Sequence, residues 1–111
     1  MFSLKSLGRK KKTAKAIWKN TVLAESDKIQ ILEGNVNFPM ESVNWEYLKP
    51  ASLRHTCPWK GKIAYFDIVV DGKVNKNAAW TYPDPLAPAR YVKDYVAFGT
   101  LPLGGTVKVE S

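Results

Sequence analysis

Cys57 is the only cysteine in the sequence, and it follows the only histidine, His55, by two residues. Lys60 comes three residues later, so a positive charge lies close along the chain. A nearby cation stabilises a thiolate, which is the nucleophilic form of cysteine, and Cys57 is therefore a candidate catalytic residue. The alternative is a buried and inert thiol, because unpaired cysteine is among the most buried residue types. His55 shares a face with Cys57 only if this segment is an extended strand.

The dipeptide Asp71-Gly72 predicts a hairpin that brings a second set of functional side chains together. A type I′ turn needs positive φ, and Asp-Gly tolerates it. The turn joins predicted strands over 62–70 and 73–82, with Val70 opposite Lys73. Regular alternation then predicts three further facing pairs: Asp67 with Lys76, Tyr65 with Ala78, and Ile63 with Trp80.

One face of this hairpin is expected to carry aromatic and polar side chains together, because alternate residues of a strand share a face. The residues on that face are Ile63, Tyr65, Asp67, Lys76, Trp80 and Tyr82. Aromatic rings stack on planar molecules and their polar tips orient them, so this face is a candidate binding cleft. The alternative is a solvated face with an ordinary cross-strand ion pair between Asp67 and Lys76.

Glu33 precedes Gly34-Asn35 and offers a carboxylate at the end of a predicted strand. Together with Asp67 it forms a candidate acid/base couple, provided that the fold brings the two carboxylates together. The alternative is a role for Glu33 in the turn itself or at the rim of a cleft.

Short strands separated by turn residues must position these side chains. Pro39 is expected to open a helical turn over 41–48, and Asp84 followed by Pro85 predicts a helix over 85–95. Apolar and polar alternation predicts strands over 16–18, 22–24, 28–33, 36–38, 53–57, 62–70, 73–82, 96–98 and 106–110. This order of elements indicates a small, mainly β, antiparallel domain with one or two short helices.

The formal net charge of +7 is confined to the start of the chain. Residues 1–20 contain seven of the seventeen basic residues and no acidic residue, so the other 91 residues are neutral overall. We therefore expect residues 1–15 to be a basic flexible arm and 16–111 to be a single domain. Any nucleic acid would be contacted through the arm, because the domain lacks a net positive field. An organelle transit peptide is an alternative use of the arm, although Lys rather than Arg dominates it.

Several classes of function are excluded by what the sequence lacks. No apolar run approaches the roughly 18–20 residues that span a bilayer, so no membrane partner is expected. A single cysteine rules out an intrachain disulfide and a cysteine-rich zinc site, and it fits the reducing cytoplasm. The sequence contains no phosphate-binding glycine loop, nucleophile elbow or metal-ligand spacing, so we expect neither a cofactor nor a metal.

Several motifs resemble, in order and spacing, those of the family catalogued as domain of unknown function 427. The resemblance covers roughly residues 16–111 and leaves the basic arm outside. Its motifs are Ala24-Glu25-Ser26-Asp27, Glu33-Gly34-Asn35 with Phe38-Pro39, Thr56-Cys57-Pro58-Trp59-Lys60-Gly61, Ala78-Ala79-Trp80-Thr81-Tyr82-Pro83-Asp84-Pro85 and Val96-Ala97-Phe98.

This resemblance implies a fold similar to the β-tent (Mss4-like) architecture, in which two antiparallel sheets lean together over a ligand-sized cleft. Many such proteins hold zinc with paired Cys-x-x-Cys motifs, which this chain cannot provide because it has one cysteine. The family has no settled activity, so the resemblance implies a fold and leaves the function open.

These observations lead to two hypotheses about function. The first is a domain that binds an unidentified small molecule in an aromatic cleft and acts as an enzyme if Cys57 is reactive. The second is a non-catalytic interaction module whose basic arm contacts nucleic acid or an acidic partner. For the first hypothesis, Cys57 is the candidate catalytic residue and the expected ligand-binding residues are Phe38, Lys60, Tyr65, Asp67, Trp80 and Tyr82. The oligomeric state does not follow from the sequence.

Overall fold

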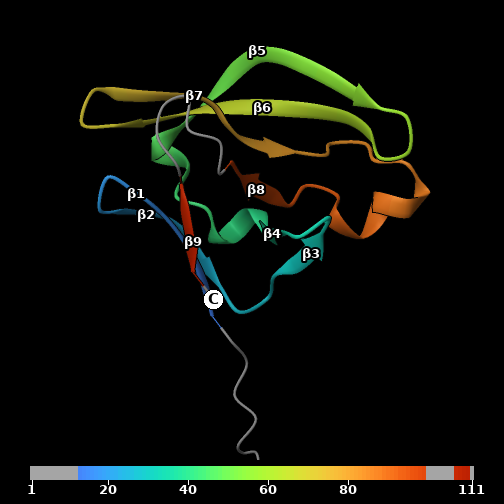
Figure 1. Cartoon of the computed structure of the whole chain (residues 1–111), viewed down its shortest axis with the longest axis horizontal. Coiled ribbons are helices and arrows are strands. Elements are labelled where there is room, and N and C mark those ends of the chain that lie inside the picture. Colours follow the sequence, from blue (N-terminus) through green and yellow to red (C-terminus); the bar gives the residue numbers. More distant parts are fainter. Residues whose placement is uncertain (1–12, 100–106, 111) are drawn as a thin grey trace, which may run out of the picture.

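Two antiparallel sheets form the fold (Figure 1). The computed structural model describes residues 13–99 and 107–110. The smaller sheet has the order β2 (Thr21–Ser26), β1 (Ala14–Trp18), β9 (Lys108–Glu110). The larger sheet has the order β3 (Gln30–Leu32), β4 (Asn35–Phe38), β8 (Val96–Phe98), β7 (Lys73–Thr81), β6 (Gly61–Val70), β5 (Leu48–Cys57). The predicted mainly β fold of two antiparallel sheets is therefore confirmed.

The three helical segments in the described residues are all short 3-10 helices: η1 (Met40–Ser42), η2 (Trp45–Tyr47) and η3 (Ala87–Val92). The helical turn expected over 41–48 is thus divided into two single turns. The helix expected over 85–95 is shorter: it begins at Ala87, with Pro88 in its first turn, where the missing N–H of proline is tolerated, and it ends at Val92. No helix among the described residues is long and apolar enough to cross a membrane.

Two-residue turns close three of the hairpins. Lys19-Asn20, Glu33-Gly34 and Asp71-Gly72 all have positive φ at both residues, as a type I′ turn requires. The turn at Asp71-Gly72 was predicted, and its closing pair of Val70 with Lys73 is confirmed.

A bulge changes the register further along the β6–β7 hairpin. Ile68 pairs with Asn75, but Phe66 pairs with Ala79, so Asp67 alone lies opposite residues 76–78. The predicted pairs of Asp67 with Lys76, Tyr65 with Ala78 and Ile63 with Trp80 are therefore wrong, and Tyr65 instead faces Trp80. Two extra residues in β7 cause the difference, because regular alternation assumes equal numbers on both strands.

Asp67 and Asn77 stabilise this bulge. Asn77 has a φ of 55°, a left-handed conformation that Asn adopts more readily than most residues. Its backbone N–H donates a hydrogen bond of 2.9 Å to Oδ1 of Asp67. The Asp67 carboxylate thus satisfies a backbone donor that the disrupted ladder would leave unpaired.

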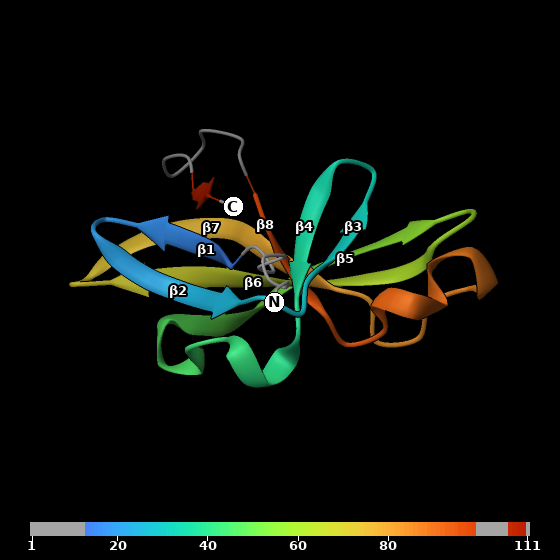
Figure 2. The ribbon, with the colours of Figure 1, turned by 90° about the horizontal axis from the view of Figure 1, so that it is seen from below.

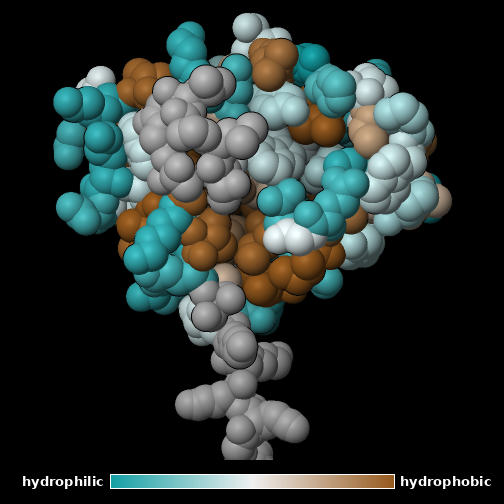
Figure 3. All heavy atoms as spheres, in the orientation of Figure 1, coloured by the Kyte–Doolittle hydropathy of each residue, from teal (hydrophilic) through white to brown (hydrophobic). Residues whose placement is uncertain are grey.

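Most of the hydrophobic core lies between the two sheets. Along β1, Ala14, Ala16 and Trp18 are buried while the residues between them are half-buried, as expected for a strand with one face on a core. Figures 1 and 2 show the smaller sheet and the β3–β4 hairpin on the same side of the layer formed by β5, β6 and β7. On the face in Figure 3, hydrophobic side chains gather below that layer. A second cluster contains Leu32, Ile63, Tyr82, Ala89 and Val92.

The N-terminal boundary of the domain lies earlier than expected. β1 begins at Ala14, which is fully buried and pairs with Ser26 in β2. Lys15 pairs with both Glu25 and Glu110. Two residues assigned to the arm therefore belong to the sheet, Thr13 precedes it, and residues 1–12 of the predicted arm lie outside the described residues.

Candidate functional site

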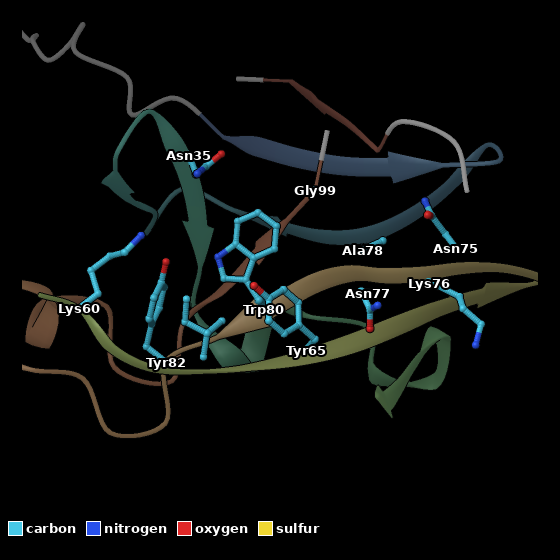
Figure 4. Close-up of a pocket in the computed structure, with 11 residues that line it drawn as sticks. Asn35, Lys60, Tyr65, Asn75, Lys76, Asn77, Ala78, Trp80, Tyr82 and Gly99 are labelled. Carbon is cyan, nitrogen blue, oxygen red and sulfur yellow. The ribbon is translucent and has the colours of Figure 1, made fainter. Parts of the chain in front are cut away.

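A pocket of about 420 Å³ opens beside the β6–β7 hairpin (Figure 4). Its lining combines residues of these two strands with Asn35 from β4, Lys60 from the β5–β6 turn and Gly99 after β8. Segments that are distant in the sequence thus form one cavity, and its aromatic members are Tyr65, Trp80 and Tyr82.

The aromatic residues form one wall of the pocket. Tyr65 and Trp80 are direct partners across β6 and β7, with ring centroids 6.3 Å apart and ring planes inclined by 49°. In Figure 4 both rings, and that of Tyr82, project from the hairpin toward β4. The prediction that Tyr65 and Trp80 share a face is confirmed. Such a wall offers both π faces for stacking and polar tips for orientation.

Lys60 is held in place by its backbone as well as by its side chain. The N–H of Leu86 donates a 2.9 Å hydrogen bond to the Lys60 carbonyl. The next residue, Gly61, has a φ of 101°, and a Cβ there would lie 3.1 Å from the carbonyl oxygen of Asp84. Only glycine adopts this conformation at so short a distance from the Asp84 backbone without strain. Gly61 therefore helps to fix the position of the Lys60 backbone, from which the side chain extends.

The side chain of Lys60 forms an ion pair with Glu33, which lies in the β3–β4 turn. Its Nζ donates to Oε1 of Glu33 and also lies 5.7 Å from the ring centroid of Tyr82. The lysine side chain is 12% exposed and the glutamate 45% exposed. This pair joins two hairpin turns at the edge of the pocket, which supports the rim position among the alternatives for Glu33.

The environment of Lys60 favours its charged form. Burial lowers the pKa of Lys60, whereas the hydrogen bond to Glu33 and the electrostatic interaction with Tyr82 raise it. The net result is a pKa above the usual value of lysine, so Lys60 carries an ammonium group at neutral pH. A protonated amine cannot attack a carbonyl carbon, so Lys60 is suited to binding rather than to covalent catalysis.

Burial also raises the pKa of Tyr65, and Tyr82 raises it further while Lys60 acts in the opposite direction. The Tyr65 phenol therefore keeps its proton at neutral pH and can donate a hydrogen bond.

Several polar groups of the pocket have no hydrogen-bond partner among the residues that the structure describes. They are the indole N–H of Trp80, the hydroxyl groups of Tyr65 and Tyr82, and the side-chain amide of Asn35. Polar groups in a partly buried wall are usually satisfied, so these are available to water or to a ligand.

Two of the predicted ligand-binding residues, Phe38 and Asp67, lie outside the pocket lining. Phe38 is fully buried in the main core, where its ring meets that of Phe98 edge to face at 5.7 Å. Asp67 binds the backbone of the bulge and is not part of the pocket wall. Because Asp67 and Glu33 have different partners, the structure gives no support to their acid/base couple.

Cys57 is half-buried and lies at the end of β5, opposite Gly61. It packs against the second hydrophobic cluster, as Tyr65 and Trp80 also do, and does not line the pocket. His55 is exposed and pairs with Ile63. Cys57 therefore lies next to residues of the aromatic wall without forming part of the pocket lining.

Asn35, Asn77 and Gly99 are pocket residues that were not expected from the sequence. A Cβ on Gly99 would lie 3.5 Å from Cζ3 of Trp80 and 3.3 Å from the carbonyl oxygen of Ala78, so the absence of a side chain there leaves room for the indole. The bulge could have been suspected from Asn77, because asparagine within a strand tolerates the positive φ that a bulge can require.

Within the described ranges, no three His, Cys, Asp or Glu side chains gather as metal ligands would.

Two antiparallel sheets with an aromatic pocket beside one long hairpin define this chain as a small β domain with a potential ligand site. It belongs to the family described as "Domain of unknown function (DUF427)", whose model matches residues 6–109. The match begins ten residues before the start that the motifs suggested, so part of the basic arm is included in the family pattern. No curated protein matches the sequence.

Proposed function

We propose that this protein binds a small planar molecule without forming a covalent bond, in the pocket lined by Tyr65, Trp80 and Tyr82. The observation that carries the proposal is the pair of Tyr65 and Trp80, whose rings face the cavity together with hydrogen-bond donors that have no partner in the described part of the chain. Concave sites with aromatic walls and a few polar groups are typical of small-molecule binding. The cavity of about 420 Å³ is large enough for a molecule of two fused rings.

Binding alone is the function that the arrangement supports best. Lys60 is charged and paired, and Cys57 lies outside the pocket wall. Catalysis by Cys57 therefore stays a prediction, which native-state labelling tests below. The single cysteine fits a reducing compartment, and the proposal accordingly places the protein in the cytoplasm.

A ligand titration of the full chain tests this function. We expect the neutral planar probe 2-naphthamide to raise the melting temperature in proportion to the logarithm of its concentration. Trp80→Ala should weaken the binding free energy by about 1–3 kcal/mol through loss of the stacking surface. Trp45→Ala is the matched control, because Trp45 is exposed, lies outside the pocket wall and packs against Phe66, which is not a pocket residue.

Equal loss of binding in both tryptophan variants would contradict the proposal, as would binding that is unchanged in Trp80→Ala. Circular dichroism of each variant shows that a loss of binding is not a loss of fold. The alternative function of the basic arm depends mainly on residues 1–12, and binding of nucleic acid that disappears on their removal would support it.

A further inference from the structure

We infer that the ligand of this pocket carries an anionic oxygen group, a carboxylate or a phosphate, which binds Lys60 in place of Glu33. The inference rests on the proposed function, and it adds the charge of the ligand and a role for Glu33 as a built-in competitor.

The charges around the pocket favour an anion. The charged side chains of its wall are Lys60 and Lys76, and the wall contains neither Asp nor Glu among the described residues. In Figure 4 the amino group of Lys76 points away from the cavity, whereas that of Lys60 points to its interior. Lys60 is therefore the cation that a bound molecule meets.

Lys60 has hydrogen-bonding capacity left for a ligand. An ammonium group has three N–H donors, and among the described residues Nζ has one acceptor, Oε1 of Glu33. Since the Lys60 side chain is only 12% exposed, water reaches the remaining donors poorly. An anionic oxygen inside the pocket would satisfy them and keep the charge compensated.

Neutral donors surround the same space. Figure 4 shows the Tyr82 hydroxyl and the indole nitrogen of Trp80 directed to the region that the Lys60 ammonium also faces, and Asn35 contributes an amide to the same lining from β4. The indole N–H can only donate, while the hydroxyl group can donate as well as accept. A cation with two such groups directed to the same space is suited to the several lone pairs of a carboxylate or phosphate.

Glu33 occupies the position of a counterion that can leave. Its carboxylate is 45% exposed at a turn, so water can solvate the Glu33 charge when it leaves Lys60. Lys60, being more buried, needs a counterion more than Glu33 does. An incoming anion can therefore replace the glutamate at low cost, and removal of the glutamate charge should strengthen anion binding.

Three planar probes separate these effects: 2-naphthoate, 2-naphthyl phosphate and the neutral 2-naphthamide. We expect Glu33→Gln to bind the favoured anion about three- to tenfold more tightly than the unmodified chain, with 2-naphthamide unchanged. Lys60→Met should abolish the preference for the anion over the amide, and Lys60→Arg should retain it. The comparison of naphthoate with naphthyl phosphate identifies the anionic group.

Calorimetric titration of the full chain distinguishes failure of this inference from failure of the proposed function. The anion inference is overturned if 2-naphthamide binds as tightly as both anionic probes and Glu33→Gln changes the affinity of neither anion. In that case the proposed binding of a planar molecule still stands. If none of the three probes binds, both are overturned. Unfolding of Lys60→Met would not decide the outcome, because Glu33→Gln and Lys60→Arg retain the test.

Discussion

Tyr65 and Trp80 lie directly opposite each other, with ring centroids 6.3 Å apart, because the bulge at Asp67 moves the register of the β6–β7 hairpin by two residues. Without the bulge, Tyr65 would face Ala78 and the two rings would be diagonal neighbours. The aromatic wall of the pocket thus depends on a bulge whose β7 residues line the pocket and whose β6 residue, Asp67, does not.

Asp67→Ala tests this dependence. Loss of the hydrogen bond from the Asn77 N–H should destabilise the protein by about 1–2 kcal/mol, measured by urea unfolding, because a part-buried donor is left unpaired. It should also weaken binding of a planar probe, since the register of Trp80 is no longer held. Asp27→Ala is the matched control, because Asp27 is an exposed carboxylate without a hydrogen bond among the described residues. Equal effects of the two substitutions would refute the role given to Asp67.

Cys57 should be slow to react in the folded protein. It is half-buried against the second hydrophobic cluster, so iodoacetamide should label it more slowly in the native state than in urea. Cys57→Ser should leave probe affinity within about twofold, because the thiol is not part of the wall.

The opposite result for Cys57 would support catalysis. Native labelling that is faster than labelling of the unfolded chain, and that slows in Lys60→Met, would indicate a thiolate stabilised by the neighbouring ammonium. The search for a ligand would then be extended to substrates that react with a Cys57 thiolate.

Stability should decline at alkaline pH. The folded-state pKa values of Lys60 and Tyr65 are both raised, so the folded protein binds their protons more tightly than the unfolded chain does. The contribution of these two groups to the free energy of unfolding is complete below their ordinary pKa values, 10.5 for lysine and 10.0 for tyrosine. It is lost as the pH rises through the raised pKa values of the folded protein. Urea unfolding between about pH 8 and 11 measures the decline, which should be smaller in Tyr65→Phe. A decline of unchanged size in Tyr65→Phe would exclude Tyr65 as a cause.

Two shortened chains test the N-terminal boundary. A chain that begins at Thr13 keeps all of β1, whereas one that begins at Ala16 lacks the buried Ala14 and the paired Lys15. We expect the second to melt about 4–8 °C below the first, which corresponds to a loss of about 1 kcal/mol in a domain of this size. Equal melting temperatures would restore the boundary expected from the basic arm.

Local features of the fold followed from the sequence by itself. Asp71-Gly72 specified its hairpin because the two residues tolerate positive φ, a property of the residues themselves. The predicted hairpin register also placed Tyr65 and Trp80 on one face, and that prediction is confirmed because the bulge adds two residues to β7 and so keeps the alternation of faces. The turn depends on residues adjacent in the chain, and the sequence therefore determined it.

The contacts between distant segments were decided by the tertiary structure. Lys60 and Glu33 are 27 residues apart, and only the packing of two hairpin turns makes them partners. Phe38 was expected in the cleft, but β4 turns its ring into the core against Phe98. The bulge at Asp67 was likewise not predicted. The alternation of residues within one strand does not show how many residues of the partner strand lie opposite it. The residues of the site could therefore be identified only from the complete fold, because the pairing of each strand and the burial of its side chains depend on the positions of the other strands.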